Sequence, residues 1–377
     1  MKEDRVARGR AQAAPKGKPK RSERGTFRRI VLGLMVLLAL LLVPAAFAGW
    51  SWWKLQRPYK GYPDSERQVT IEPGTSVAAI LQTLQKEGII ADANAARFYL
   101  VYFMGDPALQ AGDYSFRGPM STPDVLEKLA RGQVVTESVT LIEGLTLEEA
   151  ADRLEQAGLG QREVFLDLMR SPELIADLDP EAPDLEGYLF PETYSFARHT
   201  DEQTVVATLV KTFRQRWERQ VRPLLGDSPA GLREIVTLAS IVEKEARVPT
   251  ERPLIAGVYA NRVEQGIGLR ADPTVVYALK RLGRWNGNIR RADLQLDSPY
   301  NTYRYAGLPP GPICSPGLAS LQAAADPAEV PYLYFVSRND GTHVFSSTLQ
   351  EHNRNVEIWQ RQYWRDRRAR ERRQAGR

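Results

Sequence analysis

Cysteine and histidine are nearly missing from this chain of 377 residues. The single cysteine, Cys314, excludes an internal disulfide framework and any metal site built from several thiolates. The histidines are scattered along the sequence, which argues against a zinc centre; they are His199, His343 and His352. We therefore expect neither a metal site nor a cofactor.

Basic residues are scarce in the body of the chain, relative to acidic ones, and abundant at its two ends. The net charge of the whole chain is +5, but residues 1–29 carry +8 and residues 360–377 carry +6. The remaining body is therefore acidic, with a net charge of −9. Because binding to phosphates needs a basic face, this distribution excludes nucleic acid as a partner of the body.

Charge is absent from residues 30–50, whose sequence is IVLGLMVLLALLLVPAAFAGW. As a helix these 21 residues extend over about 31 Å, which is the thickness of a hydrocarbon core. The positions of an interfacial aromatic belt are occupied by Trp50, Trp52 and Trp53. We interpret residues 30–50 as a single transmembrane helix. Residues 1–29 then form a basic cytoplasmic tail, and the rest of the chain lies outside the cytoplasm.

A cleaved signal peptide is the alternative interpretation of the same stretch. The AFA motif at residues 46–48 has the small–x–small pattern of a signal-peptidase site. The length of the apolar run and the tryptophans that follow it favour the anchor.

A weak internal repeat follows a polar connector at residues 51–66. The residues VTI at 69–71 lead into a turn and a helix, and VTL at 139–141 does the same 70 residues later. Each helix is expected to begin at a cap, Ser76 or Thr146, and to end at a glycine. We divide the rest of the chain into a subdomain, a main domain and a basic tail, at residues 67–135, 136–359 and 360–377.

Residues 231–247, GLREIVTLASIVEKEAR, are predicted to form the helix that carries the chemistry. Apolar residues recur at helical spacing, and Pro249 stops the helix. We expect Asp227 or Ser228 to cap its start. The opposite, polar face is expected to contain Thr237, Ser240, Lys244 and Arg247.

Two glutamates near the end of this helix lie outside that polar face. Glu243 and Glu245 point about 200° apart, so they cannot act on one bond together. Apolar neighbours raise the pKa of a carboxyl, which suits a general acid. The alternative is that both are glutamates at the edge of the apolar stripe, held by salt bridges or reaching to water.

Three further segments have unusual composition. Residues 184–196 place carboxylates among aromatic rings, which suits a saccharide groove; the alternative is an ordinary buried loop. Residues 270–280 are expected to be rich in loops. Residues 298–317 contain five prolines and three glycines, which predicts an ordered functional loop. A DG turn at residues 340–341 predicts a hairpin.

Five ordered motifs together resemble the endolytic murein transglycosylases, the YceG-like family. They are EGYLFPETY (186–194), LASIVEKEA (238–246), LRADPTVVYAL (269–279), SPYNTYRYAGLPPGPICSPG (298–317) and DGTHVFSSTLQEHN (340–353). The resemblance covers about residues 66–360 and implies an α+β fold. It implies a membrane anchor, a small LysM-like α/β subdomain and a mixed α+β catalytic domain that faces the cell wall.

The resemblance also implies an activity and a set of site residues. The family cleaves peptidoglycan glycan strands without water and leaves 1,6-anhydro-muramyl ends, with Glu245 as the position of its catalytic glutamate. The motifs supply the residues that we expect to bind substrate, namely Glu192, Tyr194, Asp272, Asn301 and Tyr303. Expected partners are glycan strands, the cytoplasmic membrane and enzymes of cell-wall synthesis. A non-catalytic wall-binding or scaffold protein and a hydrolytic muramidase are the alternatives.

Overall fold

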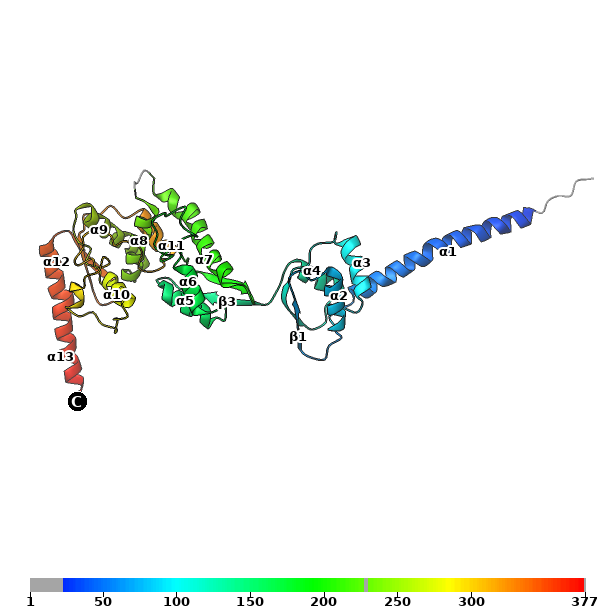
Figure 1. Cartoon of the computed structure of the whole chain (residues 1–377), viewed down its shortest axis with the longest axis horizontal. Helices are drawn as coiled ribbons and strands as arrows, with labels where there is room; N and C mark the ends of the chain where they lie inside the picture. Colours follow the sequence, from blue (N-terminus) through cyan, green and yellow to red (C-terminus); the bar gives the residue numbers. More distant parts are fainter. Residues whose placement is uncertain (1–22, 227–229, 376–377) are drawn as a thin grey trace, which may run out of the picture. The chain divides into compact units, whose positions relative to one another are not determined.

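The computed structural model describes residues 23–226 and 230–375 (Figure 1). The chain forms two compact units, Met1–Gln133 and Val134–Arg377. Most of the predicted tail at residues 1–29, and the predicted caps Asp227 and Ser228, lie outside the described residues. Helices and small two-stranded sheets alternate along the chain, which confirms the mixed α+β class.

The first unit is a small α/β body preceded by a long helix. Its elements are α1 (Glu23–Gln56), β1 (Glu66–Ile71), α2 (Val77–Lys86), α3 (Ala93–Phe103), β2 (Gly112–Arg117) and α4 (Thr122–Ala130). Strands β1 and β2 pair antiparallel, with Val69 opposite Tyr114. The sheet and helices share a buried core that includes Ile80, Leu84, Leu100, Tyr114 and Leu126.

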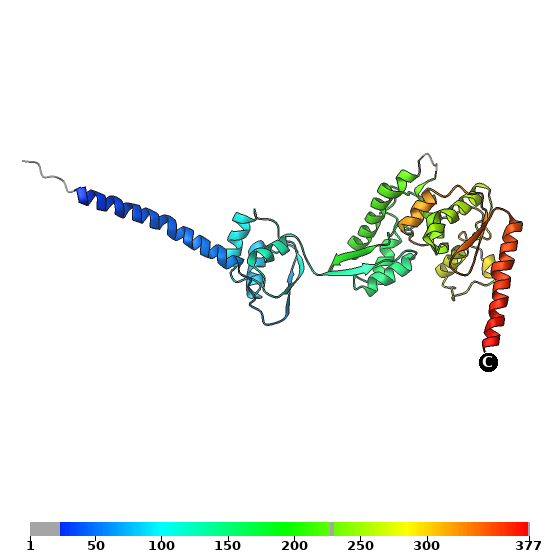
Figure 2. The ribbon, with the colours of Figure 1, turned by 180° about the vertical axis from the view of Figure 1, so that it is seen from behind.

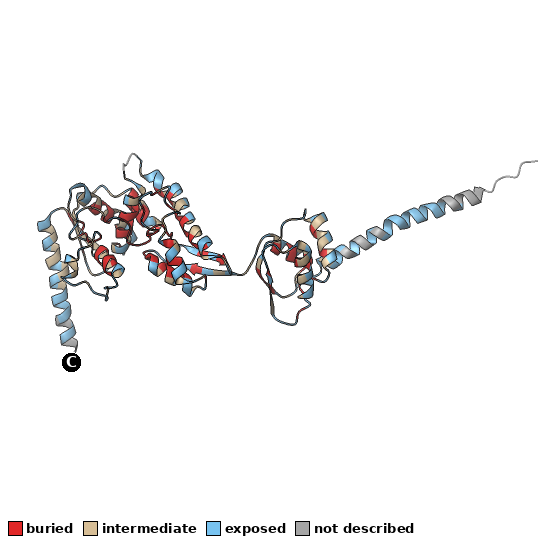
Figure 3. Ribbon diagram, in the orientation of Figure 1, coloured by how far each residue is buried: buried red, intermediate tan, exposed pale blue. Residues whose placement is uncertain are grey.

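Helix α1 contains the stretch predicted to span a membrane. Its large apolar side chains between Val31 and Val43 are exposed (Figure 3). Among the residues that the structure describes, no helix has the length and apolar character needed to cross a membrane. The transmembrane assignment of residues 30–50 is therefore not confirmed and stays a prediction, as does the LysM-like character of the first unit.

The second unit begins with the second copy of the repeat. It contains β3 (Thr136–Thr140), α5 (Leu147–Gln156), α6 (Arg162–Met169) and β4 (Thr193–Ala197). In the two predicted turns of the repeat, Gly74 and Gly144 both have a positive φ. Helix α5 begins at the expected cap, Thr146, which exchanges hydrogen bonds with Glu149 in a capping box. Since β3 pairs antiparallel with β4, as β1 does with β2, each copy is a strand–helix–helix–strand module.

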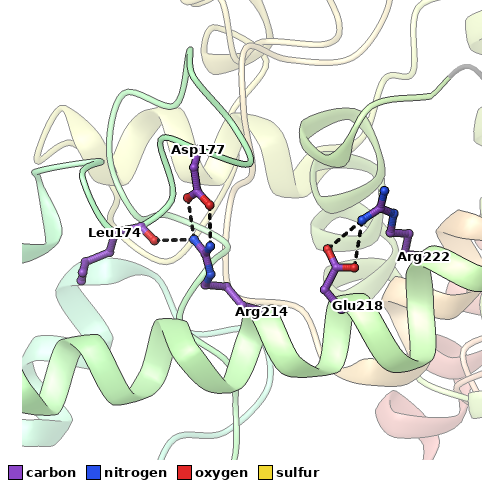
Figure 4. Close-up of polar contacts among 5 residues, drawn as sticks. All are labelled: Leu174, Asp177, Arg214, Glu218 and Arg222. Atoms are coloured by element: carbon purple, nitrogen blue, oxygen red, sulfur yellow. Dashed lines mark hydrogen bonds and ion pairs between the residues drawn. The ribbon is translucent and has the colours of Figure 1, made fainter.

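Helix α7 (Glu202–Arg216) continues into a π-helical turn, Trp217–Val221, and a short 3-10 turn, Arg222–Leu224. Arg214 fixes α7 to the segment after α6, because its guanidinium donates to both Asp177 oxygens and to the Leu174 carbonyl (Figure 4). One turn further along, Arg222 pairs with Glu218 (Figure 4).

The centre of the second unit is helical. It contains α8 (Leu232–Glu245), the 3-10 turn Pro249–Glu251, α9 (Arg252–Glu264), α10 (Asp272–Arg281), the 3-10 turn Asp293–Gln295 and α11 (Leu318–Ala325). Buried residues concentrate on α8, α9 and α11, as the red ribbon in Figure 3 shows. Residues 298–317 contain neither helix nor strand, as predicted.

The polar face predicted for the 231–247 helix is wrong over its middle turns. Thr237 and Ser240 are buried, so α8 is covered on all sides there. The reason is the proline-rich loop, which packs on this face. Ser240 Oγ donates to the Thr237 carbonyl at 2.7 Å and accepts from the Ile313 amide at 3.0 Å. Cys314 of the same loop is buried, and its Sγ donates to the Ser240 carbonyl.

The prediction of loop structure for residues 270–280 is also wrong. Residues Asp272–Arg281 form α10, in which Pro273 occupies the first turn, where a proline costs no hydrogen bond. Val275, Ala278 and Leu279 are buried at helical spacing.

The C-terminal part confirms the predicted hairpin. Strands β5 (Tyr334–Ser337) and β6 (His343–Ser346) pair antiparallel. Helix α12 (Leu349–Val356), a π-helical turn (Glu357–Gln362) and α13 (Tyr363–Ala375) follow one another without interruption, at the red end of Figure 2.

Candidate active site

Glu245 is the last residue of α8. The helix ends there because Ala246 has an extended backbone, three residues before Pro249. The side chain is half-buried and lines a pocket of about 310 Å³. This volume lies at the lower end of the range for ligand pockets, roughly 300–1,000 Å³. The other lining residues include Thr146, Lys244, Asp272, Tyr277 and Lys280.

The surroundings of Glu245 raise its pKa into the neutral range. Burial, and then the negative charge of Asp272, raise the pKa of Glu245 to about 7. The Tyr259 hydroxyl donates to Glu245 Oε1 at 3.3 Å, and this hydrogen bond lowers the pKa of Glu245. A carboxyl with a pKa near the operating pH can give up a proton and take it back, which is the requirement for general acid–base chemistry.

Three of the predicted binding residues belong to this site. Asp272, the first residue of α10, lines the pocket and accepts a hydrogen bond from the Tyr303 hydroxyl at 2.6 Å. Asn301 is buried, and its amide group donates to the Leu294 and Leu296 carbonyls. Its Oδ1 accepts from the Tyr303 amide at 3.0 Å. Asn301 therefore holds the proline-rich loop so that Tyr303 reaches Asp272.

The other two predicted binding residues line a different pocket. Glu192 and Tyr194 border a cavity of about 430 Å³ between β4 and α7. Glu192 pairs with Arg216 at 3.3 Å, and the buried Tyr194 hydroxyl donates to the Phe190 carbonyl at 2.6 Å. All four aromatic rings of residues 184–196 are buried, so the alternative of a buried loop describes these rings better than a stacking groove. A binding role for Glu192 and Tyr194 stays a prediction.

Glu243 has surroundings unlike those of Glu245. Its Oε2 accepts from the Gly317 amide at 2.9 Å, and its Oε1 lies 3.3 Å from the Arg252 guanidinium. Its side chain is 7% exposed, and that of Arg252 is 12% exposed. The salt-bridged alternative therefore describes Glu243, while Glu245 accepts a hydrogen bond from a tyrosine.

The sequence did not single out several residues that build the pocket. Tyr259 of α9 contacts Glu245, and nothing in its own segment indicates this partner. Lys244 Nζ donates to the Gly144 carbonyl at 2.8 Å, which brings the turn of the second repeat to the pocket. Lys280 of α10 pairs with Glu149 at 2.6 Å. The repeat was visible in the sequence, but its proximity to α8 was not.

A second buried carboxyl lies behind the pocket. Glu186 Oε2 accepts from the Tyr277 hydroxyl at 3.1 Å and from the Leu147 amide at 3.3 Å. Burial, with the negative charge of Asp184, raises the pKa of Glu186 to about 8. Glu186 therefore carries its proton at neutral pH and connects α5 to α10 as a neutral group. Within residues 23–226 and 230–375, no cluster of three or more acidic, histidine or cysteine side chains could hold a metal ion.

Comparisons with known proteins give consistent results. A family model described as YceG-like matches residues 69–358. An endolytic murein transglycosylase of Bacillus subtilis is 32% identical over 304 residues, which cover 76% of this chain and 82% of that protein. An endolytic murein transglycosylase of Streptococcus pneumoniae is 31% identical over 366 residues, covering 87% of this chain and 65% of that protein. A crystal structure of a YceG-like protein from Listeria monocytogenes matches 77% of this chain and 98% of its own, with 32% identity and a TM-score of 0.53.

Proposed function

The chain belongs to the YceG-like family, and from this membership we propose that it is a lytic transglycosylase, a lyase that cuts peptidoglycan glycan strands internally. The relatives named endolytic murein transglycosylase support the reaction class. The observation that carries the proposal is the partly buried Glu245, whose pKa of about 7 suits both halves of the reaction.

The reaction needs one carboxyl that acts twice. Glu245 first donates its proton to the glycosidic oxygen, and the bond from that oxygen to C1 of the muramyl sugar breaks. The Glu245 carboxylate then takes the proton of the C6 hydroxyl, whose oxygen attacks C1 and closes the 1,6-anhydro ring. No water is consumed, and the carboxyl ends in its starting state. A mechanism with a single carboxyl differs from that of hydrolases that use a pair of carboxylates.

The neighbours of Glu245 have supporting roles in this proposal. Positive charge develops on the sugar ring as the bond breaks, and the Asp272 carboxylate lines the same pocket. The negative charge of Asp272 therefore stabilises the positively charged sugar ring electrostatically. Tyr303 holds Asp272 in place through the 2.6 Å hydrogen bond.

Mass spectrometry of products is the direct test. Purified protein should release anhydro-muramyl products from isolated glycan strands. Reducing ends in their place would identify a hydrolytic muramidase. Binding of strands without any cleavage would identify the wall-binding or scaffold alternative.

We further propose that residues 30–50 anchor the protein in the cytoplasmic membrane, with the N-terminus in the cytoplasm and the catalytic unit outside. The support is the uncharged stretch that follows the basic residues 1–29. A periplasmic-type reporter fused after Arg377 should be active. A mature N-terminus at Gly49 would instead favour the cleaved signal peptide.

Asp272→Asn tests the electrostatic role of Asp272. Asparagine keeps an acceptor for Tyr303 but removes the charge that raises the pKa of Glu245. The pKa of Glu245 should fall, so its protonated fraction at pH 7 falls too. We expect cleavage at pH 7 to decrease about two- to fivefold, with the alkaline limb of the pH profile moved to lower pH. An unchanged limb would mean that solvent screens the Asp272 charge.

A further inference from the structure

Aromatic side chains gather on the surface of the first unit, outside the catalytic unit. Phe98, Tyr102 and Phe103 of α3 are 55%, 72% and 56% exposed. Trp52, near the end of α1, lies 4.9 Å from the Phe103 ring and 5.6 Å from the Tyr99 ring, measured between centroids. We call these five residues the aromatic face. Large apolar side chains grouped on a surface mark a site of interaction.

The aromatic face borders an apolar groove between α1 and α3. The groove has a volume of about 670 Å³, and its lining includes Trp50, Leu55 and Ala95. The other side of α3 is already used, because Ala96 and Leu100 are buried in the core of the unit. The exposed rings therefore lie outside this core, although Tyr99 and Phe103 contact Trp52 of α1.

The chemistry of the groove does not suit a sugar. Binding of a saccharide combines rings with polar groups that bond to its hydroxyls. The carboxyl that lines this groove belongs to Asp92, and one of its oxygens already caps α3 through the Asn94 and Ala95 amides. The remaining lining is dominated by apolar and aromatic side chains.

The chemistry does suit the boundary between lipid headgroups and acyl chains. Tryptophan and tyrosine concentrate there, because each has an apolar body and a polar tip. Cations flank this end of α1: Lys54 lies 5.3 Å from the Trp50 ring, and the Arg57 guanidinium lies 3.4 Å from the Trp53 ring. Such cations complement anionic headgroups. The exposed apolar surface between Val31 and Val43 belongs to the same helix as Trp52 of the aromatic face.

We propose that the aromatic face is a membrane-docking surface, which seats the first unit in the headgroup region of an anionic lipid bilayer. Helix α3 would lie with Phe98, Tyr102 and Phe103 among the headgroups. The proposal rests on the anchoring of residues 30–50 proposed above, and it adds a second contact with the same membrane. It does not depend on the chemistry of Glu245.

The test is fluorescence quenching in nanodiscs of phosphatidylethanolamine and phosphatidylglycerol that contain nitroxide-labelled lipid. The full chain carries Tyr102→Cys with a thiol-reactive fluorophore. The matched control carries Gln82→Cys, at an exposed position on α2 of the same unit. Because Cys314 is buried, it should react far more slowly than an exposed thiol, so a brief labelling reaction modifies only the introduced cysteine.

We expect several-fold stronger lipid quenching at position 102 than at position 82. Adding Phe98→Ser and Phe103→Ser should reduce quenching at 102 towards the control value, while the chain remains bound to the nanodisc. Equal quenching at both positions in a nanodisc-bound chain would overturn the docking surface but keep the anchor. A chain that does not bind nanodiscs would overturn both, whatever its cleavage activity. Concentration-dependent self-quenching without lipid would assign the face to a second copy.

Discussion

Replacement of Glu245 by glutamine is expected to abolish strand cleavage while leaving the fold intact. Glutamine keeps the size of the side chain and an acceptor for the Tyr259 hydroxyl, but it has no proton to give. Loss of a general acid–base group costs roughly 10²–10⁴ in rate, and here the same group serves both steps. The measurement is release of anhydro products from purified strands, with Glu243→Gln as the neighbouring control.

The same substitution has a predictable effect on stability. The pKa of Glu245 is raised from 4.5 to about 7 by folding, so the folded state holds a proton that the unfolded state has lost between these values. Stability therefore falls as pH rises through this window. The glutamine variant escapes this loss. It should melt at the same temperature as the parent near pH 4, and at an equal or higher temperature at pH 8.

Two results would contradict the assignment of Glu245. One is anhydro-product release by a folded Glu245→Gln chain. The other is full inactivity of a folded Glu243→Gln chain beside normal activity of Glu245→Gln. A circular dichroism melt of each variant shows whether it is folded.

Glu243→Ala is expected to have the opposite effect, a large loss of stability with the chemistry retained. The substitution leaves the Gly317 amide without its acceptor and removes the nearer carboxylate partner of Arg252. Glu143 then remains 3.8 Å from that guanidinium, and its side chain is half exposed. Removal of one member of a buried pair costs about 3–5 kcal/mol, a large part of a typical unfolding free energy of roughly 5–15 kcal/mol.

Urea unfolding at a fixed pH measures this loss. Glu243→Gln is the matched variant, because it retains an acceptor for the Gly317 amide and should lose less stability than alanine. At a temperature where Glu243→Ala is still folded, its cleavage activity per folded molecule should stay close to that of the parent. Unchanged stability would show that Arg252 finds another partner, and inactivity in the folded state would give Glu243 a role in the chemistry.

Local signals in the sequence predicted the parts of the fold that depend on local interactions. A helix cap or a turn glycine can be recognised from a few neighbouring residues, as at Ser76, Thr146, Gly74 and Gly144. Both repeat modules form where these signals occur. The separation of Glu243 from Glu245 follows in the same way from helical geometry. Each glutamate accordingly has its own set of partners.

The misses come from contacts between distant parts of the chain. Ser240 appeared to be on a solvent-facing stripe, because its partner Ile313 is 73 residues away. Residues 270–280 were expected to be rich in loops, yet they form α10, whose buried residues after Pro273 recur at helical spacing. Glu192 and Tyr194 share a motif with Glu186, yet Glu186 faces Tyr277 of the active pocket, and the other two face α7. No local pattern encodes these two directions.

The one thiol of the chain belongs to the proline-rich loop, at the place where this loop packs against α8. Cys314 is buried there, with Sγ against the Ser240 carbonyl. A thiol reagent can reach it only when the loop separates from α8, so its labelling rate under native conditions reports the free energy of that local opening. The native chain thus contains its own probe of this opening. A glycan strand that binds to the site and holds Tyr303 should slow the labelling of Cys314. A strand that binds elsewhere should leave the labelling rate unchanged.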